Sequence, residues 1–144
     1  MTDNYKQAIA DFLEIDIEDL KLEEHEHWGL EVYNGYAVGT DEEATEAAGK
    51  NIKDSLWSFR AEFLAEMTDI PSSVFEALQP QCENSNDAVR VLIEKTCGLE
   101  DFIESAIDSD GRGYYLASYD FEEHEASFTD EQSDEQTLYF YRID

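Results

Sequence analysis

The sequence predicts an α+β fold, with an antiparallel sheet of about four strands and a helical insert. Three observations support this prediction. Apolar residues recur at helical spacing near the N-terminus, an Asn-Gly pair lies between two β-prone runs near 30–40, and the strand-like run TLYFYRI occupies 137–143. Because helical segments separate the two strand regions, the sheet requires pairing between distant parts of the chain.

The first 40 residues contain a predicted helix and a predicted hairpin. Residues 2–14 form the helix, which Thr2 or Asp3 can cap. Its apolar stripe consists of Tyr5, Ile9, Phe12 and Leu13. An acidic connector follows at 16–26, with room for one short helical turn. In the segment 29–40, Asn34-Gly35 is the preferred pair for a type I′ turn and predicts a hairpin.

The helical insert begins where Thr40 or Asp41 can cap a helix that runs to about Trp57. Further helices are expected at 58–67, between Pro71 and Pro80, from Ser85 or Asn86 to a cap at Gly98, and at 99–107. The apolar positions of these helices repeat at helical spacing and are expected to face inward: Phe59, Phe63, Leu64, Met67, Val74, Phe75, Leu78, Val89, Leu92, Ile93, Phe102, Ile103 and Ala106.

The last third of the chain is expected to form strands. Asp110-Gly111 is a turn signal, the run YYLASY at 114–119 predicts a strand, and 122–128 is its expected partner. A polar loop at 130–136 then leads to the strand at 137–143. We find no repeat and no linker, so the sequence predicts a single acidic α+β domain over 1–144.

The charge balance is the most informative feature for function. The chain holds 36 Asp and Glu but only nine Lys and Arg, a formal net charge of -27. Apolar residues make up 42% and aromatic residues 12%, which argues against disorder. Uncancelled like charge opposes compaction, so the surplus of acidic residues indicates a basic partner, a bound cation or a solvent of high salt concentration. Nucleic acid and anionic membranes would be repelled, and neither is expected as a partner.

No targeting segment or membrane span is predicted. The chain has no apolar run of the length a membrane helix needs, and its first residues lack the basic and apolar regions of a signal peptide. We therefore expect a cytoplasmic protein. Cys82 and Cys97 flank a predicted helix, and two buried thiols are favoured over a disulfide.

Catalytic and metal motifs are absent from the sequence. It has no Gly-x-Ser-x-Gly elbow, no phosphate-binding loop and no His-Glu-x-x-His, which predicts a protein that is not an enzyme. His25 and His27 could share one face of a strand, but solvated histidines are the favoured interpretation. The segment 108–111 resembles the start of a calcium loop, yet Ala117 stands where the loop needs Glu, which favours a plain turn. No cofactor or metal is therefore predicted.

The acid content approaches the charge density of DNA. Duplex DNA carries one charge per about 1.7 Å of axis, so a charge of -27 corresponds to about 46 Å of duplex. A compact domain of this length is about 37 Å across. Acids three or four apart also share one helix face, at a spacing close to that of successive phosphates. The clustered acids that we predict to bind a partner are Glu18, Asp19, Glu23, Glu24, Glu26, Asp41, Glu42, Glu43, Glu46, Glu100, Asp101, Glu104, Asp108, Asp120, Glu122 and Glu123.

A resemblance agrees with this interpretation. The segments YAVGTDEEATEAAGKNIKDSLW at 36–57 and DGRGYYLASYDFEE at 110–123 resemble segments of small acidic proteins encoded by tailed phages. In charge and size the chain is also similar to the DNA-mimic inhibitors of phages and plasmids, of the Ocr and ArdA antirestriction type. The resemblance implies a phage origin and a role directed at a host protein in the host cytoplasm. It assigns no functional residue.

The sequence thus predicts a DNA-mimicking inhibitor that occupies the basic groove of a host restriction, CRISPR or recombination enzyme. Aromatic residues near the acids could add contact area, although most are expected in the core: Trp28, Tyr33, Tyr36 and Tyr119. A homodimer would lengthen the charged surface, while like charge opposes it. The alternatives are a domain adapted to high salt, a calcium- or other metal-binding acidic protein, and an enzyme with a carboxylate in an apolar cleft.

Overall fold

A computed structural model describes residues 3–144 and divides the chain into two compact units. The sheet unit combines the chain up to Ala48 with Arg112–Asp144, and the helical unit is Gly49–Gly111. The α+β class is confirmed, because one antiparallel four-stranded sheet coexists with helices. None of the described helices is long and apolar enough to cross a membrane.

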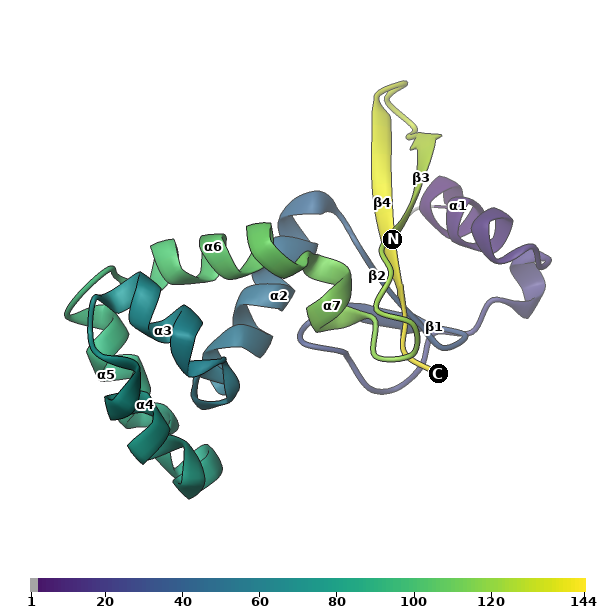
Figure 1. The fold of residues 1–144 in the computed structure, drawn as a ribbon. Helices are drawn as coiled ribbons and strands as arrows, with labels where there is room; N and C mark the ends of the chain where they lie inside the picture. The colour runs from purple at the N-terminus through teal and green to yellow at the C-terminus, as the bar shows by residue number, and fades with distance from the viewer. Residues whose placement is uncertain (1–2) are drawn as a thin grey trace. The chain divides into compact units, whose positions relative to one another are not determined.

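The sheet unit holds all four strands (Figure 1). Its elements in chain order are α1 (Asp3–Leu13), a 3-10 helix (Ile17–Asp19), β1 (Glu31–Tyr33), β2 (Tyr36–Gly39), the first part of α2 (Asp41–Asp54), α7 (Arg112–Leu116), β3 (His124–Thr129) and β4 (Glu135–Arg142). The strand order is β1-β2-β4-β3, with every neighbouring pair antiparallel. The sheet is therefore assembled from both segments of the unit.

The predicted hairpin and its long-range pairing are confirmed. Asn34 and Gly35 have φ values of 49° and 84°, as the two central residues of a type I′ turn require. β2 then pairs with β4, with Tyr36 opposite Arg142 and Val38 opposite Phe140. Because β4 also pairs with β3, this central strand joins the N-terminal hairpin to the rest of the sheet.

Helix α1 buries its apolar stripe against one face of this sheet. Ile9 and Phe140 are fully buried in the same cluster. The ring of Phe12 stacks on Phe140 with centroids 3.8 Å apart and planes 8° apart. Burying side chains of this size stabilises the fold by about 1.5–3 kcal/mol each. The predicted cap at Thr2 lies outside the described residues.

The strand predicted at 114–119 is wrong, because this segment begins within α7. The buried residues from 113 to 119 are Gly113, Leu116 and Ala117, which are spaced i, i+3 and i+4, the spacing of one helix face. The strand prediction relied on the high β propensity of the tyrosines in this segment and overlooked the helical spacing. The pairing of 122–128 with 114–119 is therefore wrong as well, because β3 pairs with β4, the strand predicted at 137–143.

The helical unit contains the rest of the insert. Its elements are the second part of α2, a 3-10 helix (Leu56–Ser58), α3 (Ala61–Thr68), α4 (Ser72–Leu78), a 3-10 helix (Gln79–Ser85), α5 (Asn86–Glu94) and α6 (Leu99–Asp110). The rings of Phe59 and Phe63 lie 5.1 Å and 5.4 Å from that of Phe102, which is fully buried. Val74, predicted to face inward, is 38% exposed.

Two smaller expectations concern the helical unit. Cys82 is exposed and Cys97 half-buried, and both are free thiols, so neither thiol is fully buried as predicted. The turn predicted at 110–111 is a break between two helices, α6 and α7. Helix α6 continues to Asp110, and Gly111 ends it with a φ of 84° and an amide bonded to the Ile107 carbonyl at 2.7 Å.

Candidate protein-interaction surface

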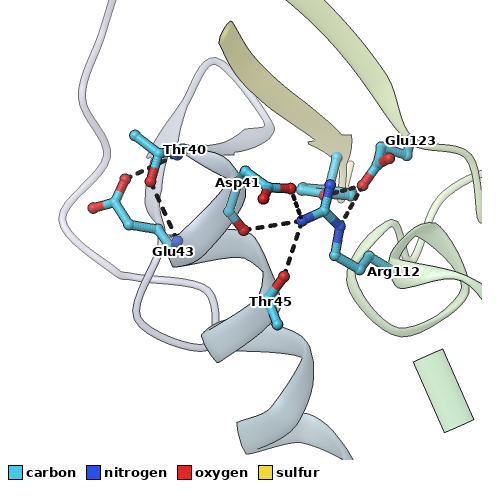
Figure 2. A network of polar contacts seen from close by, with 7 residues as sticks. Thr40, Asp41, Glu43, Thr45, Arg112 and Glu123 are labelled. Carbon is cyan, nitrogen blue, oxygen red and sulfur yellow. Dashed lines mark hydrogen bonds and ion pairs between the residues drawn. The ribbon is translucent and has the colours of Figure 1, made fainter. Parts of the chain in front are cut away.

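A network around Arg112 holds the start of α7 in place (Figure 2). The guanidinium Nη1 donates to the carbonyl oxygen of Asp41 at 2.9 Å, to its Oδ1 at 2.7 Å and to Oγ1 of Thr45 at 3.0 Å. Its Nε donates to Oε1 of Glu123 at 2.8 Å, and the hydroxyl of Tyr141 donates to the same oxygen. The guanidinium carbon also lies 4.6 Å from the ring centroid of Tyr139. One side chain thus joins α2, α7, the chain before β3, and β4.

This network perturbs the groups that form it. Partial burial acts to lower the pKa of Arg112, but the hydrogen bonds to Glu123 and Asp41 outweigh it and the pKa is raised. Burial, followed by the hydrogen bond to Glu123, raises the pKa of Tyr141. Arg112 is therefore charged at every physiological pH, and Asp41 and Glu123 serve the fold in addition to any partner.

The start of α2 is fixed by a capping box. Oγ1 of Thr40 accepts from the amide of Glu43 at 3.2 Å, and Oε1 of Glu43 accepts from the amide of Thr40 at 2.9 Å (Figure 2). The predicted cap at Thr40 is confirmed. Glu43 is accordingly a structural residue as well as a surface acid.

C-terminal to Arg112 the chain exposes a segment rich in aromatic residues, which we call the aromatic segment and define as residues 114–122. Tyr114, Tyr119 and Phe121 are 55%, 59% and 60% exposed. The rings of Tyr114 and Phe121 stack with centroids 5.8 Å apart, and the guanidinium of Arg142 lies 3.8 Å from the Tyr119 centroid. Asp120 and Glu122 alternate with these rings in the sequence. Exposed aromatic side chains of this kind are typical of the energetic centres of protein interfaces.

Phe121 adds a second signal at this segment. Its φ of 60° is in the left-handed region, where a bulky residue is a true outlier. The amide of Phe121 donates to the carbonyl oxygen of Ala117 at 2.7 Å, which holds the backbone in this conformation. A strained backbone that presents an exposed ring is characteristic of functional sites.

The acidic connector at 16–26 runs along the outer edge of β1. Leu22 forms a bridge with Tyr33, and the amide of Glu23 donates to the Val32 carbonyl at 2.8 Å. Oε2 of Glu23 accepts from the amide of Gly35 at 2.7 Å. Glu23 therefore anchors the connector to the hairpin, while its neighbours Glu24 and Glu26 stay exposed.

A second group of acids lies at the opposite edge of the sheet. The amide of Tyr119 donates to the Arg142 carbonyl at 3.0 Å, whereas Ile143 bonds towards β2 through Gly35. The segment that carries Asp120, Glu122 and Glu123 is thus on the β3 side of β4. From connector to β3 there are four strand spacings, or about 19 Å.

The predicted acids are divided between the two units. The sheet unit carries the predicted acids of the connector, of the start of α2 and of the segment before β3. The helical unit carries the predicted acids of α6. The sheet unit has 23 of the 36 acidic and four of the nine basic residues. The predicted acids with exposed side chains and no role described above are Glu18, Asp19, Glu24, Glu26, Glu42, Glu46, Glu100, Asp101, Glu104, Asp108 and Glu122.

The aromatic and histidine predictions have mixed outcomes. Of the four aromatics, Tyr33 is buried, Trp28 and Tyr36 are half-buried, and Tyr119 is exposed. Tyr114 was missed because a strand was predicted at 114–119, although the spacing of Gly113, Leu116 and Ala117 could have shown that Tyr114 is on the outer side of a helix. Phe121 lies between the two predicted strands, and no sequence signal marks it as exposed.

His27 departs from the predicted solvated state. Its Nε2 lies 2.8 Å from the Leu116 carbonyl, and burial lowers its pKa. His25 remains exposed, with Nδ1 3.9 Å from Glu23. His27 therefore packs in the fold rather than facing a ligand with His25.

Comparison with protein-family models, with curated proteins and with solved structures gives no match to this chain.

Proposed function

We propose that this protein is a DNA-mimicking inhibitor that occupies the basic DNA-binding groove of a host defence or DNA-processing protein. The observation that carries the proposal is the concentration of acid in the sheet unit, where 23 acidic residues stand against four basic ones. Such a field attracts basic surfaces and repels nucleic acid and anionic membrane. The resemblance to phage proteins supports a phage origin and a target in the host cytoplasm.

The arrangement of the acids supports mimicry of a duplex. Exposed carboxylates occur along both edges of one sheet, about 19 Å apart. A groove that receives the sheet would meet negative charge on both sides, as it does with two phosphate strands. Inhibition would then be competitive, with fast and salt-sensitive association.

The aromatic segment would supply contact area at the edge of the sheet that also carries Asp120 and Glu122. Tyr114, Tyr119 and Phe121 are large and rigid, and they lose little side-chain entropy on binding. Arg142 beside Tyr119 leaves the surface at the rings less negative than the acids around them. We assign the exposed rings to the main contact at this edge and the exposed acids around them to the rim of the interface.

Competition with DNA tests the mechanism. Tagged protein is used to capture host proteins from a bacterial lysate at low salt, and the beads are then treated with excess duplex DNA. Captured DNA-binding proteins are expected in the eluate. If they stay on the beads, groove mimicry is the wrong mechanism.

Two matched variants then locate the interface. One replaces Glu18, Asp19, Glu24 and Glu26 in the connector by the corresponding amides, and the other does the same for Glu100, Asp101, Glu104 and Asp108 in α6. Each removes four exposed charges. The connector variant is expected to bind the captured target at least about tenfold more weakly than the α6 variant, since each lost charge pair costs a few tenths of a kcal/mol or more. Equal affinities would show that only total charge matters.

A further inference from the structure

We propose that Asp120, Glu122 and His124 form a binding site for a divalent transition-metal ion. Within residues 3–144, this is the one group of three or more potential ligands whose donor atoms all lie within 4.8 Å of one another. Nε2 of His124 is 3.8 Å from Oδ2 of Asp120 and 3.9 Å from Oε2 of Glu122. The inference does not depend on the proposed function.

Two of the three side chains are already oriented. Oδ1 of Asp120 accepts from the amide of Glu122 at 3.1 Å, which leaves Oδ2 directed at the imidazole. His124 begins β3 opposite Phe140, and its ring lies 5.9 Å from that of Phe12. Hydrogen bonds and packing contacts that hold the ligand side chains in this way strengthen metal binding.

The donor set determines the class of ion. Two carboxylates and one imidazole suit zinc, manganese, iron, cobalt or nickel, whereas calcium and magnesium prefer oxygen alone. Ligands at about 2.0–2.2 Å from a tetrahedral ion are about 3.4 Å apart, so Nε2 of His124 must approach each of the two carboxylate oxygens by about half an ångström. The side chains of His124 and Asp120 are 40% and 28% exposed, which permits this movement and leaves room for water as a further ligand.

The site also suits its electrostatic surroundings. Two carboxylates balance the charge of a divalent ion, and the surplus of acid in the sheet unit raises the local concentration of cations. An imidazole close to two carboxylates distinguishes this site from the connector, where His25 lies near the carboxylate of Glu23 alone. A specific zinc site is thus expected among many weak, non-specific cation contacts.

Calorimetric titration of the full chain with zinc tests the proposal. The protein carries Cys82→Ser and Cys97→Ser, because free thiols bind zinc themselves. One equivalent of zinc is expected to bind at least about tenfold more tightly than calcium. His124→Gln and Asp120→Asn are each expected to weaken zinc binding at least about tenfold. Asp120→Asn keeps the oxygen that accepts from Glu122, so its folding is preserved.

His25→Gln is the matched control, since His25 also lies 3.9 Å from a carboxylate but lacks the second one. It is expected to leave zinc affinity unchanged, and only the His124 ring resonances should shift with zinc in NMR spectra. The proposal is overturned if zinc does not bind, if calcium binds equally well, or if His124→Gln binds zinc as the parent protein does.

Discussion

Arg112 and Glu123 are joined by a hydrogen bond of 2.8 Å from Nε to Oε1, across a turn of the chain that includes the whole aromatic segment. The same carboxylate oxygen accepts from Tyr141, and the other side of the guanidinium contacts Asp41. The exposed rings are thus presented by a segment whose two ends are held by one ion pair.

We expect Arg112→Lys to destabilise the sheet unit by about 2 kcal/mol. Lysine keeps the charge but cannot reach Asp41, Thr45 and Glu123 together. The Arg112 side chain is only 11% exposed, although Asp41 is 76% exposed, so the loss is smaller than for a fully buried pair. Urea unfolding followed by Trp28 fluorescence in a Trp57→Phe background measures this, because Trp28 belongs to the sheet unit.

Arg90→Lys is the control for this change. Arg90 forms an exposed pair with Glu94 one helical turn away, and its loss should cost less than about 0.5 kcal/mol. Because Arg90 belongs to the helical unit, its unfolding is followed by Trp57 fluorescence in a Trp28→Phe background. A similar small effect for Arg112→Lys would show that the network does not hold the fold.

Gly113 is packed against the backbone of residues 121–123. A Cβ at this position would lie 2.8 Å from the carbonyl oxygen of Phe121 and 2.9 Å from the amide nitrogen of Glu123. Gly113→Ala is therefore expected to destabilise the sheet unit by about 2 kcal/mol or more, because backbone cannot move aside cheaply. In Gly49→Ala the nearest atom, of Ile103, is 3.7 Å away, and helix α2 should gain about 0.5–1 kcal/mol. The urea midpoints are expected to shift in opposite directions, as followed by Trp28 for Gly113→Ala in the sheet unit and by Trp57 for Gly49→Ala in the helical unit.

Local sequence signals were sufficient to predict several elements of the fold. The Asn34-Gly35 turn, the capping residue Thr40 and the terminal strand were predictable because each depends on local chemistry. The strand predicted at 114–119 failed because tertiary packing overrode β propensity: Gly113 is the residue that permits close approach of the chain before β3.

The candidate surface was only partly predictable, for a similar reason. Clusters of acids are visible in the sequence, but whether a carboxylate bonds within the fold depends on contacts that are distant in the chain. Asp41 and Glu123 meet through Arg112, and Glu23 meets the Gly35 amide. Nothing in the local sequence around Phe121 indicates its left-handed backbone.

A third expectation separates stability from binding at Phe121. Asparagine tolerates the left-handed region far better than phenylalanine, so Phe121→Asn should keep the stability of the sheet unit or raise it by up to about 1 kcal/mol. The same change removes an exposed ring from the aromatic segment and should weaken target binding at least about tenfold, as loss of an interface anchor does. Val91→Asn, at an exposed position of the helical unit, is the control for lost apolar surface. Unchanged binding by Phe121→Asn would remove the segment from the interface.

The fourth expectation is a pH dependence that arises from His27. Burial lowers its folded-state pKa below 6.5; the Leu116 carbonyl opposes this and the charge of His25 adds to it. A lowered pKa contributes stability above the unfolded value, and this contribution is lost as the pH falls below 6.5. The free energy of unfolding should therefore decline from pH 7 towards pH 5 in the parent protein. His27→Gln should flatten the decline and His25→Gln should not, and equal slopes in all three would exclude His27 as the cause.

The pairing of β2 with β4 has a consequence for how the chain folds during synthesis. Tyr36 meets Arg142 only after about a hundred further residues have been made, and closing a loop of that length costs about 4 kcal/mol of entropy. The helical unit is one continuous segment and need not wait, whereas the nascent β1–β2 hairpin keeps an uncovered edge until the last strand emerges. Open edges of this kind invite aggregation. The negative charge of neighbouring nascent chains would keep them apart during this interval, which gives the acid surplus a benefit in biogenesis.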